Sequence, residues 1–107
     1  MRNAAIIKNK AIIPLLEEAV ELIKITRSVD KIVLFGSQAR GDFTKASDID
    51  LAIFGNVTLG NYQVLKDRLE TIRTLKRIDL VHFENANDYM KDAINKQAII
   101  LYERNKD

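Results

Sequence analysis

Two aspartates, Asp48 and Asp50, lie one residue apart in the otherwise apolar segment SDIDLAIFG at 47–55. If this segment is a strand, both side chains point to the same face, with α-carbons about 6.5 to 7 Å apart. Ile49 and Leu51 then face the core. Two carboxylates held this close raise each other's pKa and oppose folding unless a cation lies between them. The pair therefore predicts a metal site.

A third carboxylate, Asp79, has the same apolar flanks in the segment RIDLVHFE at 77–84. If the two strands are neighbours, about 4.8 Å apart, the three carboxylates can converge on one spot. Ligation by oxygen alone suits Mg²⁺ or Mn²⁺ better than Zn²⁺, and the chain has no cysteine and one histidine. Two divalent ions roughly 3.5 to 4 Å apart would offset the three charges and clamp an in-line phosphoryl displacement. We expect the three aspartates to be the catalytic and metal-binding residues.

The apolar run KIVLFG at 31–36 ends in Gly36, and Ser37 follows it. A glycine at a strand end lets the backbone approach a ligand closely, and the Ser37 hydroxyl and nearby N–H groups can bind phosphate oxygens. Arg40 lies about one helical turn further on, where it could reach a phosphate or stay on the surface. We expect Gly36, Ser37 and Arg40 to form the nucleotide side of the site. The glycine-lysine phosphate loop of ATPases is absent, and Ala52 and Ile53 break the calcium-loop pattern.

Helical and extended patterns alternate along the chain. Apolar spacings of three and four residues predict helices over 11–25 and 60–74 and a short helix that begins near Asn85 or Asn87. β-branched and aromatic runs predict strands over 31–36, 47–55, 77–84 and 98–102. This alternation predicts an α/β fold with a small mixed sheet of three to four strands covered by helices, and it leaves the strand directions open.

The length of 107 residues predicts one domain, 1–107, without room for a separate substrate-binding domain. The absence of cysteine and of a signal peptide predicts a cytoplasmic protein, and no apolar run reaches the roughly 20 residues of a membrane span. Seventeen basic residues are scattered among 15 acidic ones, for a net charge of +2, so a nucleic-acid surface is not indicated.

Gly36-Ser37, ten intervening residues, Asp48-Ile49-Asp50 and the later Asp79 together resemble the nucleotidyltransferase superfamily of DNA polymerase beta. The run GSQARGDFTKASDIDL is similar to its small prokaryotic members, the minimal nucleotidyltransferases or MNT domains. The resemblance implies that Asp48 and Asp50 bind two Mg²⁺ ions and nucleotide phosphates. It implies that Asp79 helps to activate the attacking hydroxyl, and that Gly36 and Ser37 hold the triphosphate. A nucleoside monophosphate would pass from a nucleoside triphosphate to a hydroxyl, with release of pyrophosphate.

The resemblance also implies a partner, because MNT proteins assemble with small helical HEPN proteins. In such pairs the HEPN protein is a toxin with ribonuclease character, and the MNT protein is an antitoxin that uses ATP to attach AMP to one of its tyrosines. Larger relatives carry a C-terminal helical domain that helps to hold the acceptor, and this chain shows no counterpart. A partner or a homo-oligomer would then complete the acceptor site.

Two other functions stay open from the sequence. The chain could be a non-catalytic antitoxin that covers its partner, or a nucleotidyltransferase that modifies a small molecule such as an aminoglycoside. We expect His82 to be structural, because it is offset by three residues from Asp79 and so faces the other side of the strand. Tyr62, Tyr89 and Tyr102 are expected in the core or an interface, although exposed tyrosines could also accept AMP.

Overall fold

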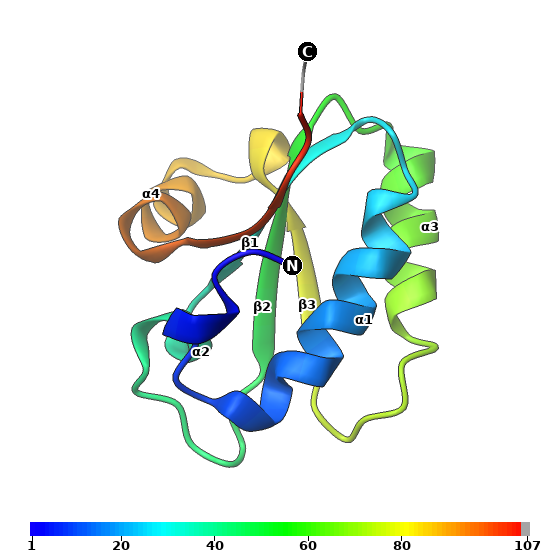
Figure 1. Cartoon of the computed structure of the whole chain (residues 1–107). Helices are drawn as coiled ribbons and strands as arrows, with labels where there is room; N and C mark the ends of the chain where they lie inside the picture. Colours follow the sequence, from blue (N-terminus) through cyan, green and yellow to red (C-terminus); the bar gives the residue numbers. More distant parts are fainter. Residues whose placement is uncertain (106–107) are drawn as a thin grey trace.

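A computed structural model describes residues 1–105, and four strands in it form one mixed sheet (Figure 1). The strand order is β3-β2-β1-β4. β1 pairs antiparallel with β2 and with β4, whereas β2 and β3 are parallel. The predicted α/β class, with a mixed sheet of three to four strands, is confirmed. The strands are β1 (Val29–Phe35), β2 (Ile49–Gly55), β3 (Ile78–His82) and β4 (Ile99–Glu103).

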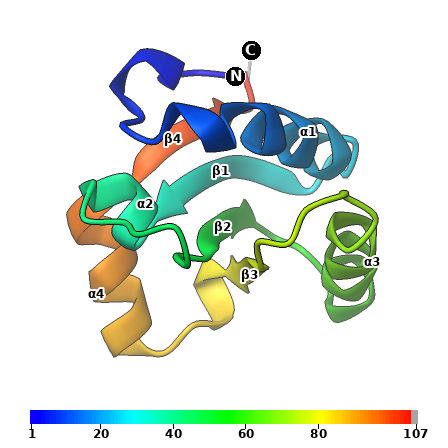
Figure 2. The same ribbon diagram turned by 90° about the horizontal axis from the view of Figure 1, so that it is seen from below.

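Helices cover both faces of the sheet. The two longest, α1 and α3, lie on one face, and α4 lies on the other (Figures 1 and 2). The short helix α2 follows β1 directly and lies near α4 in both views. The helices are α1 (Ile13–Lys24), α2 (Ser37–Arg40), α3 (Leu59–Leu69) and α4 (Asp88–Gln97), with single 3₁₀ turns η1 (Ala4–Ile6), η2 (Lys10–Ile12) and η3 (Phe83–Asn85).

Most predicted elements are present, and their ends differ from the prediction. β2 begins at Ile49 rather than 47, so that Asp48 lies just before the strand instead of inside it. α3 ends at Leu69 rather than 74, because the chain turns there with the Ile72 N–H donating to the Leu69 carbonyl. Ile72 still packs in the core with 5% exposure, which explains why its apolar spacing continued the helical pattern. β3 likewise ends at His82, where η3 begins.

β1 is buried on both faces, as its continuous apolar run predicts. Ile32 and Leu34 belong to the larger core cluster, which includes residues of α1 and α3. Val33 and Phe35 pack with Ile94 of α4 in the smaller cluster on the other face. β1 therefore holds the two helical layers together, and its last residue is the one from which the Gly-Ser turn departs. Within residues 1–105, no helix is long and apolar enough to cross a membrane.

Local caps account for the helix starts. Pro14 lies in the first turn of α1, where its missing N–H has no helical partner to lose. The Asn87 side chain accepts from the Met90 N–H at 2.8 Å and so caps α4. The other expected cap, Asn85, lies in η3 and donates instead to Nδ1 of His82. His82 is buried and its Nε2 donates to the Gly55 carbonyl at 2.8 Å, so the expected structural role is observed.

Candidate active site

Asp50 and Asp79 are direct neighbours across the parallel pair β2 and β3. Ile49 and Leu51 are fully buried, and both belong to the core cluster on the α1 and α3 face. Because side chains alternate along a strand, Asp50 points to the opposite face, where Ala52 packs in the α4 cluster. The sequence-based expectation that these two strands adjoin and bring two carboxylates together is confirmed.

The Asp50 carboxyl group lies in an electrostatically unfavourable position. Burial raises its pKa above the ordinary value, and the negative charges of Asp79 and Asp48 raise it further. The positive charges of Arg40 and Arg77 lower it, but only in part. Asp48 therefore lies within electrostatic reach of Asp50, although Asp48 itself is exposed and precedes β2. At neutral pH this group of carboxylates would be stabilised by an additional cation.

Gly36 lies opposite these carboxylates at the end of β1, where Phe35 pairs with Asp50. Its φ of 73° is in the left-handed region, which side chains disfavour. A Cβ atom placed on Gly36 would overlap the Oδ2 atom of Asp50. The glycine is thus needed both for the turn and for the close approach of the Asp50 carboxylate to the backbone at this position. The Gly36 carbonyl accepts from the N–H groups of Ala39 and Arg40, which folds α2 with Ser37 as its first residue.

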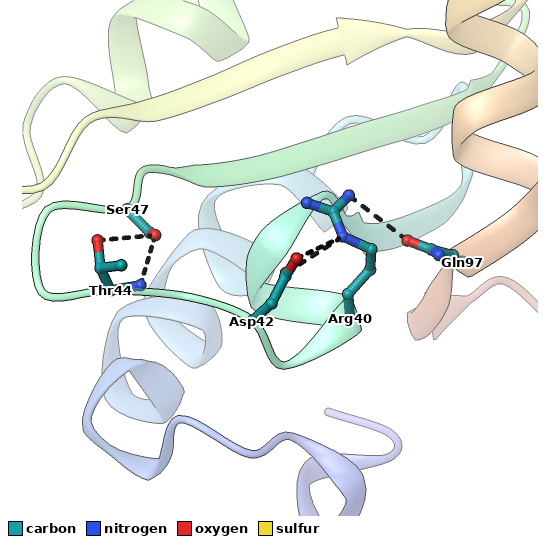
Figure 3. Close-up of polar contacts among 5 residues, drawn as sticks. All are labelled: Arg40, Asp42, Thr44, Ser47 and Gln97. Carbon is teal, nitrogen blue, oxygen red and sulfur yellow. Dashed lines mark hydrogen bonds and ion pairs between the residues drawn. The ribbon is translucent and has the colours of Figure 1, made fainter.

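Arg40 is held over the surface beside α4 (Figure 3). Its Nε lies 3.1 Å from Oδ1 of Asp42, and its Nη1 donates to Oε1 of Gln97 at 3.5 Å. The side chain is exposed, yet its charge lowers the pKa of Asp50. Arg40 therefore faces the acidic group, and a phosphate contact by this guanidinium stays a prediction.

Arg77 is a site residue that the sequence analysis missed. Its Nε lies 2.8 Å from Oδ1 of Asp79, and it also lowers the pKa of Asp50. Arg77 immediately precedes β3, and the only signal in the sequence was its spacing of two residues from Asp79, which places both side chains on one face if the extended backbone continues back to residue 77. Asp79 is thus paired with Arg77, and both Asp79 and Asp48 act on Asp50 through their charge. Among residues 1–105, no three His, Cys, Asp or Glu side chains are already gathered as a metal site.

Tyr62 of α3 lies within electrostatic reach of Asp79. Its hydroxyl donates to the Leu80 carbonyl at 2.5 Å, and burial together with the charge of Asp79 raises its pKa. Tyr62 and Tyr102 pack against the larger core cluster, as expected for packing residues. Tyr89 differs, because it is 83% exposed on α4.

A groove of about 430 Å³ adjoins Asp79 and is lined by residues of α3, of the connection from α3 to β3, and of β3. Leu69 and Ile78 contribute to its apolar floor, and Lys66, Lys76 and Arg77 contribute positive charge to its walls. β3 is the last strand of the sheet on this side. Asp79 is thus reachable from the open edge of the molecule, whereas Asp50 lies one strand further in.

Comparison with known sequences gives matches over most of the chain. Residues 17–107 match the family described as Polymerase beta, Nucleotidyltransferase. MJ1379 of Methanocaldococcus jannaschii, a candidate protein adenylyltransferase, is 33% identical over 87 residues, which cover 76% of this chain and 85% of that protein. A second candidate protein adenylyltransferase of the same organism, MJ0604, is 62% identical over only 29 residues. These span 27% of this chain and 29% of MJ0604, less than a third of its length.

Solved structures share the fold. A chain in a crystal structure of a toxin-antitoxin with AMP-PNP superposes with a TM-score of 0.69 at 22% identity, covering 82% of this chain and 73% of that one. A chain in the complex of a tri-AMPylated Shewanella oneidensis HEPN toxin with an MNT antitoxin matches with a TM-score of 0.53 at 24% identity. That match covers 84% of this chain and 73% of the other.

Proposed function

This chain belongs to the polymerase beta family of nucleotidyltransferases, and from that premise we propose that it transfers AMP from ATP to a tyrosine of a HEPN-type toxin as its antitoxin. The observation that carries the proposal is the pairing of Asp50 with Asp79 opposite the Gly36 turn. The similarity to candidate protein adenylyltransferases supports a protein acceptor. The shared fold with an antitoxin complexed to an AMPylated HEPN toxin supports the choice of partner.

The donor set fits a divalent cation of the Mg²⁺ or Mn²⁺ type. Asp48 and Asp50 offer carboxylate oxygens, the ligands that these ions prefer, and no cysteine competes for a softer metal. The raised pKa of Asp50 supports the same assignment, because burial, followed by the negative charges of Asp79 and Asp48, disfavours its ionised form until a cation offsets the charge. Asp79 would be the third ligand. When bound, Mg²⁺ would neutralise phosphate oxygens and stabilise the charge that develops during phosphoryl transfer.

The other residues of the proposed site would bind the triphosphate and accept the proton of the attacking hydroxyl. The N–H groups and hydroxyl of the Gly36-Ser37 turn would bind the triphosphate, and Arg40 would add a charged contact to it. The acceptor oxygen forms a bond to the α-phosphorus, while the bond from that phosphorus to the pyrophosphate oxygen breaks. The hydroxyl proton passes to the carboxylate of Asp79. Catalysis would thus depend on positioning and charge stabilisation rather than on a covalent enzyme intermediate.

The position of Asp79 supports an acceptor supplied by another molecule. It lies on the edge strand beside an open groove, so a tyrosine from a partner protein could approach it without entering the core. In this proposal residues 1–107 form one domain that binds the nucleotide, and the toxin supplies the acceptor. A cytoplasmic site of action stays a prediction from the sequence.

The test uses ATP labelled at the α-phosphate, Mg²⁺, the purified chain and its HEPN partner. We expect label on the partner, and at least 100-fold slower transfer by the Asp48→Asn/Asp50→Asn double variant, because the metal and triphosphate lose their carboxylate ligands. Asp67→Asn on the exposed surface of α3 is the matched control and should transfer at the wild-type rate. No transfer by the wild type, or equal transfer by the double variant, rejects the proposal.

The same variants separate the two other functions that the sequence leaves open. A purely steric antitoxin predicts that the double variant protects cells from the toxin as well as the wild type does. A small-molecule transferase predicts labelling of an added aminoglycoside without the partner. The proposed function predicts loss of protection by the double variant and no labelling of the aminoglycoside.

A further inference from the structure

Gln38 is a buried polar side chain to which the proposed reaction gives no role. It is the second residue of α2 and only 1% exposed, yet both ends of its amide have partners. Its Oε1 accepts from Nδ2 of Asn9 at 3.1 Å, and its Nε2 donates to the Ser47 carbonyl at 3.4 Å. The Oδ1 of Asn9 accepts from the Ala11 N–H, which fixes the direction of both amides. Gln38 therefore joins the N-terminal segment, α2 and the loop before β2.

Lys76 approaches the same loop from the segment that leads into β3. Its Nζ donates to the carbonyls of Lys45 at 3.0 Å and Ser47 at 3.2 Å. A carbonyl oxygen has two lone pairs, and the one of Ser47 accepts from Gln38 and from Lys76. The carbonyl oxygen of Ser47 thus links the loop both to α2 and to the connection that precedes β3.

This atom immediately precedes Asp48, whose position the sheet does not fix. β2 begins at Ile49, whose N–H donates to the Arg77 carbonyl at 2.9 Å. Within the loop, the Thr44 N–H donates to Oγ of Ser47 at 2.8 Å (Figure 3). That local bond shapes the turn, and the bonds from Gln38 and Lys76 place the turn relative to the sheet.

We propose that Gln38 and Lys76 are positioning residues that hold the Ser47 carbonyl from two sides and so place the Asp48 carboxylate beside Asp50. The inference rests on the proposed function, because it concerns the carboxylates that would bind a divalent cation there. Removing either donor leaves Asp48 free to move away from Asp50. The cation then has to order the loop as it binds, which lowers its affinity.

Gln38 also affects the phosphate side of the proposed site, because it follows Ser37 directly in α2. The backbone that would bind the triphosphate and the loop that carries Asp48 are therefore linked through one side chain. A change at Gln38 weakens binding of the triphosphate by the Gly36-Ser37 turn and binding of the cation by Asp48. A change at Lys76 weakens only the binding of the cation. In transfer assays this predicts a rise in KM for the metal-nucleotide with Gln38→Met that is larger than the fall in kcat.

The direct test measures Mn²⁺ affinity of the full chain by electron paramagnetic resonance, without nucleotide or partner. Gln38→Met keeps the side-chain length and removes the amide, and Lys76→Met removes the ammonium group. We expect about tenfold weaker Mn²⁺ binding in each, equal to ~1.4 kcal/mol. Lys76→Arg retains N–H donors and restores binding to within about threefold of the wild type.

Two exposed positions supply matched controls. Gln63→Met removes an amide that donates to Asp67 on α3, and Lys96→Met removes an ammonium group paired with Asp92 on α4. Both controls bind Mn²⁺ within about twofold of the wild type. Amide hydrogen exchange of the metal-free protein gives a second readout, since the Ser47 N–H, which donates to the Thr44 carbonyl, exchanges faster in the two positioning variants and at an unchanged rate in the controls.

The possible outcomes separate this inference from the proposed function. If Gln38→Met and Lys76→Met bind Mn²⁺ like the wild type, the positioning role is wrong while nucleotidyl transfer still stands. If the wild type binds Mn²⁺ no better than the Asp48→Asn/Asp50→Asn variant, both ideas fail. If Gln38→Met does not fold, Lys76→Met decides by the same criterion, because its side chain is only half-buried.

Discussion

Asp50, a proposed metal ligand, has a carboxyl group that opposes the stability of the fold. Its neighbours Ile49 and Leu51 are fully buried, so the strand cannot rotate to release the carboxylate to water. The resulting burial, and two nearby negative charges, make the ionised form unfavourable. A bound cation would offset the electrostatic cost of ionising Asp50, which would explain why a carboxylate occupies this position.

Replacing Asp50 by Asn is expected to stabilise the metal-free protein at pH 7. The folded-state pKa of Asp50 is raised above its ordinary 3.8, so the folded state binds the proton more tightly than the unfolded state does. The free energy of unfolding of the wild type therefore falls as the pH rises from the unfolded-state pKa through the folded-state pKa of Asp50. The variant has no carboxyl group at this position and does not lose this stability. Because the group is half-exposed, we expect only about 0.5 kcal/mol, or roughly 2 to 4 °C in Tm.

The measurement is thermal unfolding in EDTA at pH 7 and again near pH 4. The difference between Asp50→Asn and the wild type should shrink at the lower pH, where more of the wild-type carboxyl is protonated. A variant that is less stable than the wild type at pH 7 would show that Asp50 makes a favourable interaction in the folded state, contrary to this interpretation.

The turn between β1 and α2 depends on a single glycine. Gly36→Ala has to adopt a φ of 73° and would push its Cβ into the Asp50 carboxylate. We expect the free energy of unfolding to fall by about 2 kcal/mol, and nucleotide binding to weaken because the Asp50 carboxylate is displaced from the Gly36 turn. Urea unfolding and nucleotide titration measure the two effects.

Gly60 is the matched control for that substitution, since it lies in the first turn of α3, where an added methyl group would meet open space. Gly60→Ala is expected to raise the free energy of unfolding by up to about 1 kcal/mol, because alanine loses less backbone entropy on folding. Equal effects at Gly36 and Gly60 would contradict the steric argument.

The four strands and the helices α1, α3 and α4 were largely predictable from their apolar spacing or continuous apolar runs, whereas the short helix α2 was not predicted. The errors lie where a tertiary contact replaces the local pattern. Ile72 keeps helical spacing but packs from a turn after α3, and Asp48 keeps strand spacing but lies before β2. The pairing of Asp50 with Asp79 needed only that two strands adjoin.

Other parts of the site could not be predicted from the sequence. Gln38 occupies a position where any helix-compatible residue would fit the local pattern. Its hydrogen-bond partners are Asn9, which is distant in the sequence, and Ser47, which lies at the far end of the following loop. In the sequence Lys76 is indistinguishable from the other lysines of the surface. Its bond to the Ser47 carbonyl becomes visible only in the fold, where β3 lies beside β2. Long-range hydrogen bonds of this kind have no periodicity, so pattern analysis misses them.

The sheet, which lies between the two helical layers, brings together the residues proposed to bind the nucleotide. Gly36 and Ser37 leave from the end of β1, Asp50 comes from β2, and Asp79 comes from the edge strand β3. A metal-nucleotide that contacts all three would bind only the folded chain, because these residues are brought together by the sheet. Ligand binding and folding are then coupled, and the size of the coupling follows from mass action.

Magnesium with ATP is therefore expected to raise the Tm of the wild type, and EDTA should reverse the rise. At ligand concentrations about 100 times the dissociation constant, the stabilisation is roughly 2.7 kcal/mol, or on the order of 10 °C for a domain of this size. The Asp48→Asn/Asp50→Asn variant should lose nearly all of this increase, whereas Asp67→Asn should keep it. A non-hydrolysable ATP analogue separates binding from turnover, since it should give the same increase without any transfer. An equal increase in the double variant would mean that the nucleotide binds elsewhere, and the pairing of Asp50 with Asp79 would no longer support the proposed nucleotide site.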